Sequence, residues 1–215
     1  VRSRRQRQMC IRDSIQSVDA LIVLTEKQKH DIVSRYGHED KVYVIPNYYD
    51  PNVSKIKGLK SILTTMKQDS SERDMSKVVI VSRFSGIKNI DHTIKAFKKV
   101  IAEVPEAKLE IWGSGDKEKE YAGMIESLGL DDNVLIKGYT QNPGKIYQSG
   151  ALSVLTSNAE GFSLAVMESM ANKTPVVSYN IRYGPSDMIE DGVNGFLTEK
   201  NDIETLSERI IQMLK

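Results

Sequence analysis

The sequence predicts an α/β fold in which a parallel β-sheet is covered by helices on both faces. Short runs rich in β-branched residues alternate along the chain with stretches whose apolar residues recur at helical spacing. The short runs are apolar almost throughout, rather than at every second residue, as expected for strands that are buried on both faces. Alternation of this kind is typical of a parallel sheet whose strands are connected by helices.

Seven segments are predicted as strands: residues 20–24, 42–45, 78–82, 108–112, 133–137, 151–155 and 175–179. The clearest helix covers residues 91–104, where Ile94 and Phe97 belong to one apolar face, and Asn89 or Asp91 is expected to cap its start. A parallel sheet binds its ligands at the carboxyl ends of its strands, beside the point where the strand order reverses. We therefore expect the functional residues at that edge.

Composition and charge are those of an ordinary globular protein and exclude several classes. The chain has 215 residues, of which 40% are hydrophobic and 27% charged. Its apolar runs are too short to cross a bilayer. The single cysteine, Cys10, excludes a disulfide framework and fits a cytoplasmic location. The net charge is +1, but the first fourteen residues hold five arginines and one aspartate, so the remainder is slightly acidic. An acidic body argues against a nucleic-acid groove.

Four segments are predicted from these patterns. Residues 1–14 lack the apolar region of a signal peptide and are interpreted as a non-native leader, with a nucleic-acid arm as the alternative. Residues 15–50 hold two strands and one helix, and are interpreted as the end of a preceding domain. Residues 51–76 are polar and rich in serine and lysine, which indicates a linker. Residues 77–215 form the main α/β domain.

Two glutamates, Glu160 and Glu168, bracket an almost wholly apolar run after the strand at 151–155. We expect Glu160 on a loop, a helix beginning near Phe162, and Glu168 about two turns into that helix. This separation is too large for the carboxylate pair of a retaining glycosidase. It suits two acceptors for hydroxyl groups of an elongated ligand, whose anionic part would lie at the first free helix amides, up to Leu164. Alternatively, Glu160 caps the helix and Glu168 faces solvent.

Two cations, Arg83 and Lys88, follow the strand at 78–82 and precede the helix at 91–104. Both are therefore expected at the ligand-binding edge of the sheet. A converging arginine and lysine can neutralise a diphosphate through charge-assisted hydrogen bonds. The alternative is that both are solvated loop charges.

The motifs VSRFSGIKNIDHTIKAF, LEIWGSGD, NVLIKGY and EGFSLAVMESMANKTPVV resemble, in this order, the donor-binding half of a GT-B glycosyltransferase of the large retaining family 4. The stretch YNIRYGPSDMIEDGVNG is similar to bacterial enzymes that glycosylate wall teichoic acid, other glycerol-phosphate polymers and surface proteins. The resemblance covers about residues 18–215. It implies two Rossmann-like domains, of which this chain would hold the C-terminal, nucleotide-sugar-binding domain and, in residues 15–50, the end of the N-terminal acceptor domain.

The resemblance also implies roles for individual residues. Arg83 and Lys88 would bind the donor diphosphate, Glu160 would contact the transferred sugar, and Glu168 would accept from the ribose hydroxyls. The residues whose amides would bind sugar and phosphate are Gly161, Phe162, Ser163 and Leu164, and those whose backbone would contact the base are Gly138, Tyr139 and Thr140. Ser163 stands where many family members have glycine or proline, which we expect to be tolerated because the backbone makes the contact.

The implied reaction is transfer of a hexose, glucose or N-acetylglucosamine, from a UDP-sugar to a cell-wall polymer, a glycan or a protein. The implied partners are the nucleotide-sugar donor and that acceptor, without nucleic acid. No cofactor is expected beyond the UDP-sugar co-substrate. No metal is expected either, because there is no D-x-D motif and the three histidines share no ligand spacing. The expected location is the cytoplasm, with peripheral membrane association through the acceptor domain.

Three alternatives remain open. The stretch GSGDKE at residues 113–118 begins like a dinucleotide fingerprint, but Glu118 replaces its third glycine, so NAD binding is disfavoured. A non-catalytic nucleotide-sugar-binding module would keep Arg83 and Lys88 but would need no acceptor cleft. A GT-B nucleotide-sugar epimerase would need acid and base groups that are not recognised here.

Overall fold

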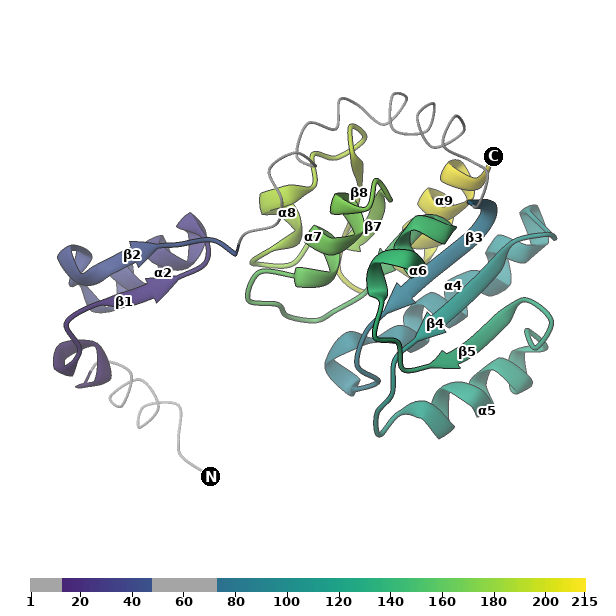
Figure 1. Ribbon diagram of the computed structural model, residues 1–215, viewed down its shortest axis with the longest axis horizontal. Helices are drawn as coiled ribbons and strands as arrows, with labels where there is room; N and C mark the ends of the chain where they lie inside the picture. Colours follow the sequence, from purple (N-terminus) through teal and green to yellow (C-terminus); the bar gives the residue numbers. More distant parts are fainter. Residues whose placement is uncertain (1–12, 48–72) are drawn as a thin grey trace. The chain divides into compact units, whose positions relative to one another are not determined.

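A computed structural model describes residues 13–47 and 73–215 (Figure 1). The chain divides into two compact units, residues 1–48 and residues 49–215. Among the described residues, no helix combines the length and the apolar character that a bilayer-spanning segment needs. The predicted leader at 1–14 and linker at 51–76 lie mostly outside the described residues, so these domain assignments stay predictions.

The first unit contains a two-stranded parallel sheet and the helix that connects its strands. Strands β1 (Leu21–Val23) and β2 (Val42–Val44) are joined by α2 (Glu26–Tyr36) and a short 3₁₀ turn, η1 (Glu39–Lys41). Thr25 caps the start of helix α2, because its side chain accepts a hydrogen bond from the Gln28 amide. Val23 and Val42 are buried, whereas Ile22 and Tyr43 are exposed, as the alternation of side chains along strands requires.

The second unit is built on a six-stranded, all-parallel sheet with the order β5-β4-β3-β6-β7-β8. The strands are β3 (Asp74–Val81), β4 (Lys108–Trp112), β5 (Val134–Gly138), β6 (Gly150–Leu155), β7 (Val176–Tyr179) and β8 (Gly195–Thr198). The connecting helices are η2 (Gly86–Lys88), α4 (Ile90–Glu103), α5 (Glu118–Leu128), α6 (Pro143–Ser149), α7 (Leu164–Ala171), α8 (Pro185–Met188) and α9 (Ile203–Leu214).

Helices cover both faces of this sheet (Figure 1). Alternate residues of the central strand β6 show the two layers. Leu152 and Val154 belong to the main core, to which α4, α5 and α9 contribute, whereas Leu155 packs with Val166 of α7 in a second cluster. The α/β class, the parallel sheet and the helices on both faces are therefore confirmed.

Three details differ from the sequence prediction. Strand β3 begins at Asp74, so the last residues assigned to the linker belong to the sheet. Strand β8 was not predicted, because its four residues follow Asn194, and an Asn-Gly pair is typical of a turn. Helix α7 begins at Leu164 rather than near Phe162. The reason is that Ser163 has a φ of 69°, which a right-handed helix cannot contain.

Candidate active site

The strand order reverses between β3 and β6. From β3 the chain continues to β4 and β5 on one side, and then returns to β6, β7 and β8 on the other. The loop after β3 leads to α4 and the loop after β6 leads to α7, and these helices cover opposite faces of the sheet. Ligands of doubly wound sheets bind at such a point, outside the carboxyl ends of the strands.

Hydrogen bonds connect the two loops. The buried Thr156 hydroxyl, at the end of β6, is 2.8 Å from the Asn89 carbonyl and 3.0 Å from the Lys88 carbonyl. The Asn158 amide donates to the Ile87 carbonyl at 2.7 Å, and its side chain donates to Asn89 Oδ1 at 3.0 Å. The loops are thus held against each other by side-chain and backbone contacts.

Lys88 and Glu160 meet at this junction. Lys88 Nζ lies 2.6 Å from Glu160 Oε1, and the side chains are 23% and 14% exposed, respectively. Arg83 lies on the same loop as Lys88 and is exposed, and it has no ion-pair partner among the described residues. The structure therefore places these three predicted residues on adjoining loops, and it joins Lys88 directly to Glu160.

The loop between Glu160 and α7 ends in a strained residue, Ser163. Ser163 is buried in the left-handed region, and its hydroxyl has no hydrogen-bond partner among the described residues. Gly184 packs closely beside it, because a Cβ atom there would lie 2.6 Å from the Phe162 carbonyl oxygen. Helix geometry leaves the amides of the first turn, Leu164 and Ala165, without an acceptor inside α7. Leu164 belongs to the predicted group of amides, whereas Ala165 lies one residue beyond it.

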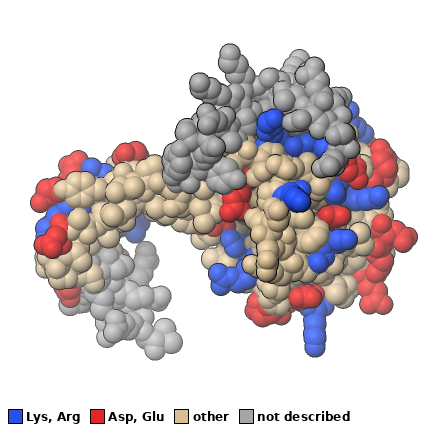
Figure 2. Space-filling model, viewed as in Figure 1, with Lys and Arg blue, Asp and Glu red and all other residues tan. Residues whose placement is uncertain are grey.

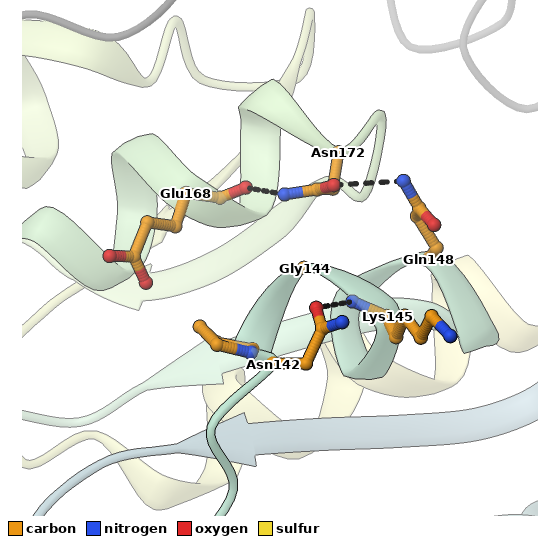
Figure 3. A pocket seen from close by; sticks show the side chains of 7 residues that line it. Asn142, Gly144, Lys145, Gln148, Glu168 and Asn172 are labelled. Atoms are coloured by element: carbon orange, nitrogen blue, oxygen red, sulfur yellow. Dashed lines mark hydrogen bonds between the residues drawn. The ribbon is translucent and has the colours of Figure 1, made fainter.

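A cavity of about 530 Å³ lies between α6 and α7, and Glu168 lines it (Figure 3). Its size falls in the range of small-molecule sites. The other lining residues are Asn142, Pro143, Gly144, Lys145, Gln148 and Asn172. Burial raises the pKa of the Glu168 carboxyl, because a carboxylate loses hydration there. Burial, together with the negative charge of Glu168, also raises the pKa of Tyr147 on α6.

The loop after β5 leads directly into this cavity. Gly138 ends β5 with a φ of 78°, the Tyr139 side chain is 74% exposed, and the Thr140 hydroxyl accepts a hydrogen bond from the Asn142 amide at 3.0 Å. Glu168 lines the cavity, whereas Gly138, Tyr139 and Thr140 precede its lining residue Asn142 in the chain and are not among the lining residues.

Sequence reasoning missed the α6 wall of this cavity. A signal was present, since Asn142 followed by Pro143 is typical of a helix start, and the Asn142 side chain indeed accepts from the Lys145 amide. Asn172 was missed as well, because its role depends on α6 and α7 packing side by side.

The two glycines of the stretch GSGDKE allow the loop after β4 to pack closely against the loop after β3. A Cβ atom on Gly113 would lie 1.8 Å from the Ser82 carbonyl oxygen, and one on Gly115 would lie 2.2 Å from the Phe84 carbonyl oxygen. These glycines let the loop after β4 lie directly against the loop that carries Arg83.

Charged and metal-ligating side chains are dispersed among the described residues. Figure 2 shows Lys and Arg interspersed with Asp and Glu on the visible face of the described residues. Within the described ranges, no three His, Cys, Asp or Glu side chains gather as a metal site would require.

The parallel sheet with helices on both faces matches the fold of GT-B glycosyltransferases, and comparison with known proteins identifies the family. Residues 61–215 match the family described as glycosyl transferases group 1, and the chain therefore belongs to this family. It is 37% identical over 199 residues to a poly(glycerol-phosphate) alpha-glucosyltransferase of Bacillus subtilis, a match that covers 93% of this chain and 28% of that protein.

Two further matches have a similar extent. The chain is 33% identical over 202 residues to a poly(ribitol-phosphate) alpha-N-acetylglucosaminyltransferase of Staphylococcus aureus, covering 94% of this chain and 38% of that protein. A crystal structure of a mutant of S. aureus TarM, in complex with fondaparinux, alpha-GlcNAc-glycerol and UDP, matches with a TM-score of 0.82 and 33% identity. That match covers 96% of this chain and 39% of the other. The chain thus spans about a third of the length of these relatives.

Proposed function

We propose that this chain carries the donor-binding half of a retaining glycosyltransferase of family 4. The enzyme transfers glucose or N-acetylglucosamine from a UDP-sugar to a cell-wall polymer, a glycan or a protein. The observation that carries the proposal is the joint placement of Lys88, Glu160 and Glu168 on the loops and helix that follow the central strands. Relatives named as glucosyl- and N-acetylglucosaminyltransferases support the choice of sugar.

In this proposal each group has a distinct task. Glu168, in the cavity beside the loop after β5, accepts hydrogen bonds from the ribose hydroxyls of UDP. Arg83 and Lys88 contact the diphosphate, and the amides at the start of α7 add positive potential to it. Glu160 accepts from a hydroxyl of the transferred sugar. The backbone from Gly138 to Thr140 contacts the base.

These contacts favour departure of the diphosphate. The bond between the anomeric carbon and the phosphate oxygen breaks, and negative charge develops on UDP near Arg83 and Lys88, which stabilise it most in the transition state. The acceptor hydroxyl attacks the same face of the sugar, and its proton passes to the departing phosphate oxygen. This step needs no metal and no further cofactor. We place the enzyme in the cytoplasm, with peripheral membrane association through its acceptor domain.

Titration calorimetry with UDP tests this proposal on the 215-residue chain. We expect UDP to bind without added magnesium, and Arg83→Ala to weaken binding about tenfold or more, because a hydrogen bond between charged groups contributes about 1.5 kcal/mol or more. Arg35→Ala, which removes an exposed arginine of the first unit, is the matched control and should leave binding unchanged. Binding that requires magnesium, or that ignores the loss of Arg83, would contradict the assignment.

A further inference from the structure

Arg73 lies immediately before β3 and connects segments that are far apart in the sequence. Its Nη1 donates to the Gly150 carbonyl at 2.7 Å and to the Thr174 hydroxyl at 2.9 Å. Its Nη2 donates to the Asn172 carbonyl at 3.3 Å. The buried Thr174 hydroxyl is in turn 2.6 Å from the Tyr147 carbonyl, to which it donates. A single guanidinium thus binds the chain after α6 and the chain after α7.

The acceptors of Arg73 lie at the C-terminal ends of two helices. Gly150 follows the last residue of α6, and Asn172 is the C-terminal cap of α7. Helix carbonyls that have no partner within the helix give this end a partial negative charge, which a cation stabilises. The planar fork of arginine can reach both helix ends at once, whereas the ammonium of a lysine has a different, more compact geometry.

Helices α6 and α7 form the two walls of the Glu168 cavity, and each of them buries only one or two side chains. The only buried side chain of α6 is Tyr147, and those of α7 are Val166 and Ser169. A second polar connection joins the walls, since Gln148 donates to Asn172 Oδ1 at 3.0 Å, and Asn172 Nδ2 donates to the Glu168 carbonyl at 2.8 Å (Figure 3). The hydrogen bonds of Arg73 and Gln148 therefore help to set the distance between α6 and α7.

We propose that Arg73 is a positioning residue for nucleotide binding. It holds α6 against α7 and so sets the width of the cavity and the place of Glu168, although Arg73 does not line the cavity. This inference rests on the proposed function, in which that cavity receives the ribose of UDP. Loss of the fork should loosen the two helices and weaken nucleotide binding while the sheet and the main core stay intact.

Arg73→Lys tests the inference, because it keeps the charge and removes the fork. Amide hydrogen exchange of the free 215-residue chain should become faster in residues 143–149 and 164–171 and stay unchanged in α4 and α5. Calorimetry should show about tenfold weaker UDP binding, as expected for the loss of charge-assisted hydrogen bonds. Arg209→Lys is the control, since Arg209 lies on α9 over the Phe196 ring, away from the cavity lining. It should change neither measurement.

The outcomes separate this inference from the proposed function. Arg73→Lys protein that binds UDP as well as the wild type, or whose helices α6 and α7 exchange at the wild-type rate, would overturn the role of Arg73. A wild-type chain that binds no UDP would overturn the proposed function and, with it, the role in nucleotide binding. Should Arg73→Lys fail to fold, Gln148→Ala decides, because this exposed residue carries the second connection. Because Gln148 itself lines the cavity, hydrogen exchange is the deciding measurement for this variant, and unchanged exchange of α6 and α7 in Gln148→Ala would contradict positioning by these contacts.

Discussion

At the residue scale, the contact between Lys88 and Glu160 would make Glu160 a competitor of the donor diphosphate in the proposed function. A lysine that binds a diphosphate must share its ammonium with, or withdraw it from, the carboxylate 2.6 Å away. Glu160→Gln should therefore raise the affinity for UDP, by about two- to fivefold, since partly exposed ion pairs contribute up to about 1 kcal/mol. In the complete enzyme the same change should lower turnover, because the contact with the sugar is weakened.

Calorimetry of UDP binding measures the first effect, and a sugar-transfer assay with the full-length enzyme measures the second. Glu106→Gln, at an exposed position remote from these loops, is the control. Weaker UDP binding by Glu160→Gln would show that Glu160 assists the diphosphate contact instead of opposing it.

The raised pKa of Glu168 has a consequence for stability. Burial favours the protonated form in the folded state, so the folded chain binds more protons than the unfolded chain at pH values between the ordinary carboxyl pKa of 4.5 and the raised one. The free energy of unfolding should therefore fall as the pH rises through that window. Above the window, Glu168 should cause no further change of this free energy with pH. Glu168→Gln should remove this dependence and stabilise the chain at neutral pH.

Urea unfolding of the wild type and Glu168→Gln between pH 4.5 and 8 measures the difference. UDP affinity should fall in the same variant, because the amide accepts fewer hydrogen bonds from ribose than the carboxylate does. A stability difference that does not change with pH would contradict the burial of a charged carboxylate at this position.

At the scale of elements, the sequence allowed the central strands to be predicted well and their irregular ends less well. Strands such as β6 and β7 are buried along their whole length, and burial on both faces is what their composition indicates. The positions of Arg83, Lys88 and Glu160 at the sheet edge followed from counting residues beyond these strands. The start of α7 did not, because the left-handed backbone of Ser163 has no signature in a serine.

The cavity between α6 and α7 could not be predicted for a different reason. Its walls meet through contacts between residues 24 positions apart or more, such as Gln148 with Asn172 and Arg73 with Gly150. Amphipathic patterns indicate that a helix packs on the sheet, but they do not give the spacing between two neighbouring helices. The position of Glu168 in the helix after β6 was therefore predictable, and its surroundings were not.

The backbone of Ser163 leads to a prediction for α7. A left-handed conformation costs a non-glycine residue about 1 kcal/mol, and its buried hydroxyl without a described partner adds to that cost. Ser163→Gly should raise the free energy of unfolding by about 1 kcal/mol, since glycine adopts this φ without strain. Ser163→Ala, which removes the hydroxyl but keeps the strain, should stabilise less. Urea denaturation compares the three chains, and a destabilising glycine would contradict strain at this position.

At the scale of the whole molecule, the extent of the similarity bears on activity. The chain spans 28% and 38% of two curated relatives that it matches over nearly its full length. In a GT-B enzyme the acceptor approaches from the other domain, and closure of the two domains excludes water. We expect the 215-residue polypeptide to bind UDP-sugar but to transfer no sugar, even to a suitable glycerol-phosphate polymer. A radiolabelled donor assay measures transfer, and saturable transfer by this polypeptide alone would contradict the expectation.

The hydrogen bonds of Thr156 to the loop after β3 have a kinetic and entropic consequence for the binding of the donor. Because Thr156 and Asn158 hold that loop in place beforehand, little chain ordering remains to be done when UDP arrives. Association should then be limited by diffusional encounter and steering by charge, and substitutions in the site should act mainly on the residence time of the nucleotide. In the proposed function, the loops at the junction between β3 and β6 would thus be preorganised for the donor and would keep their conformation when it binds.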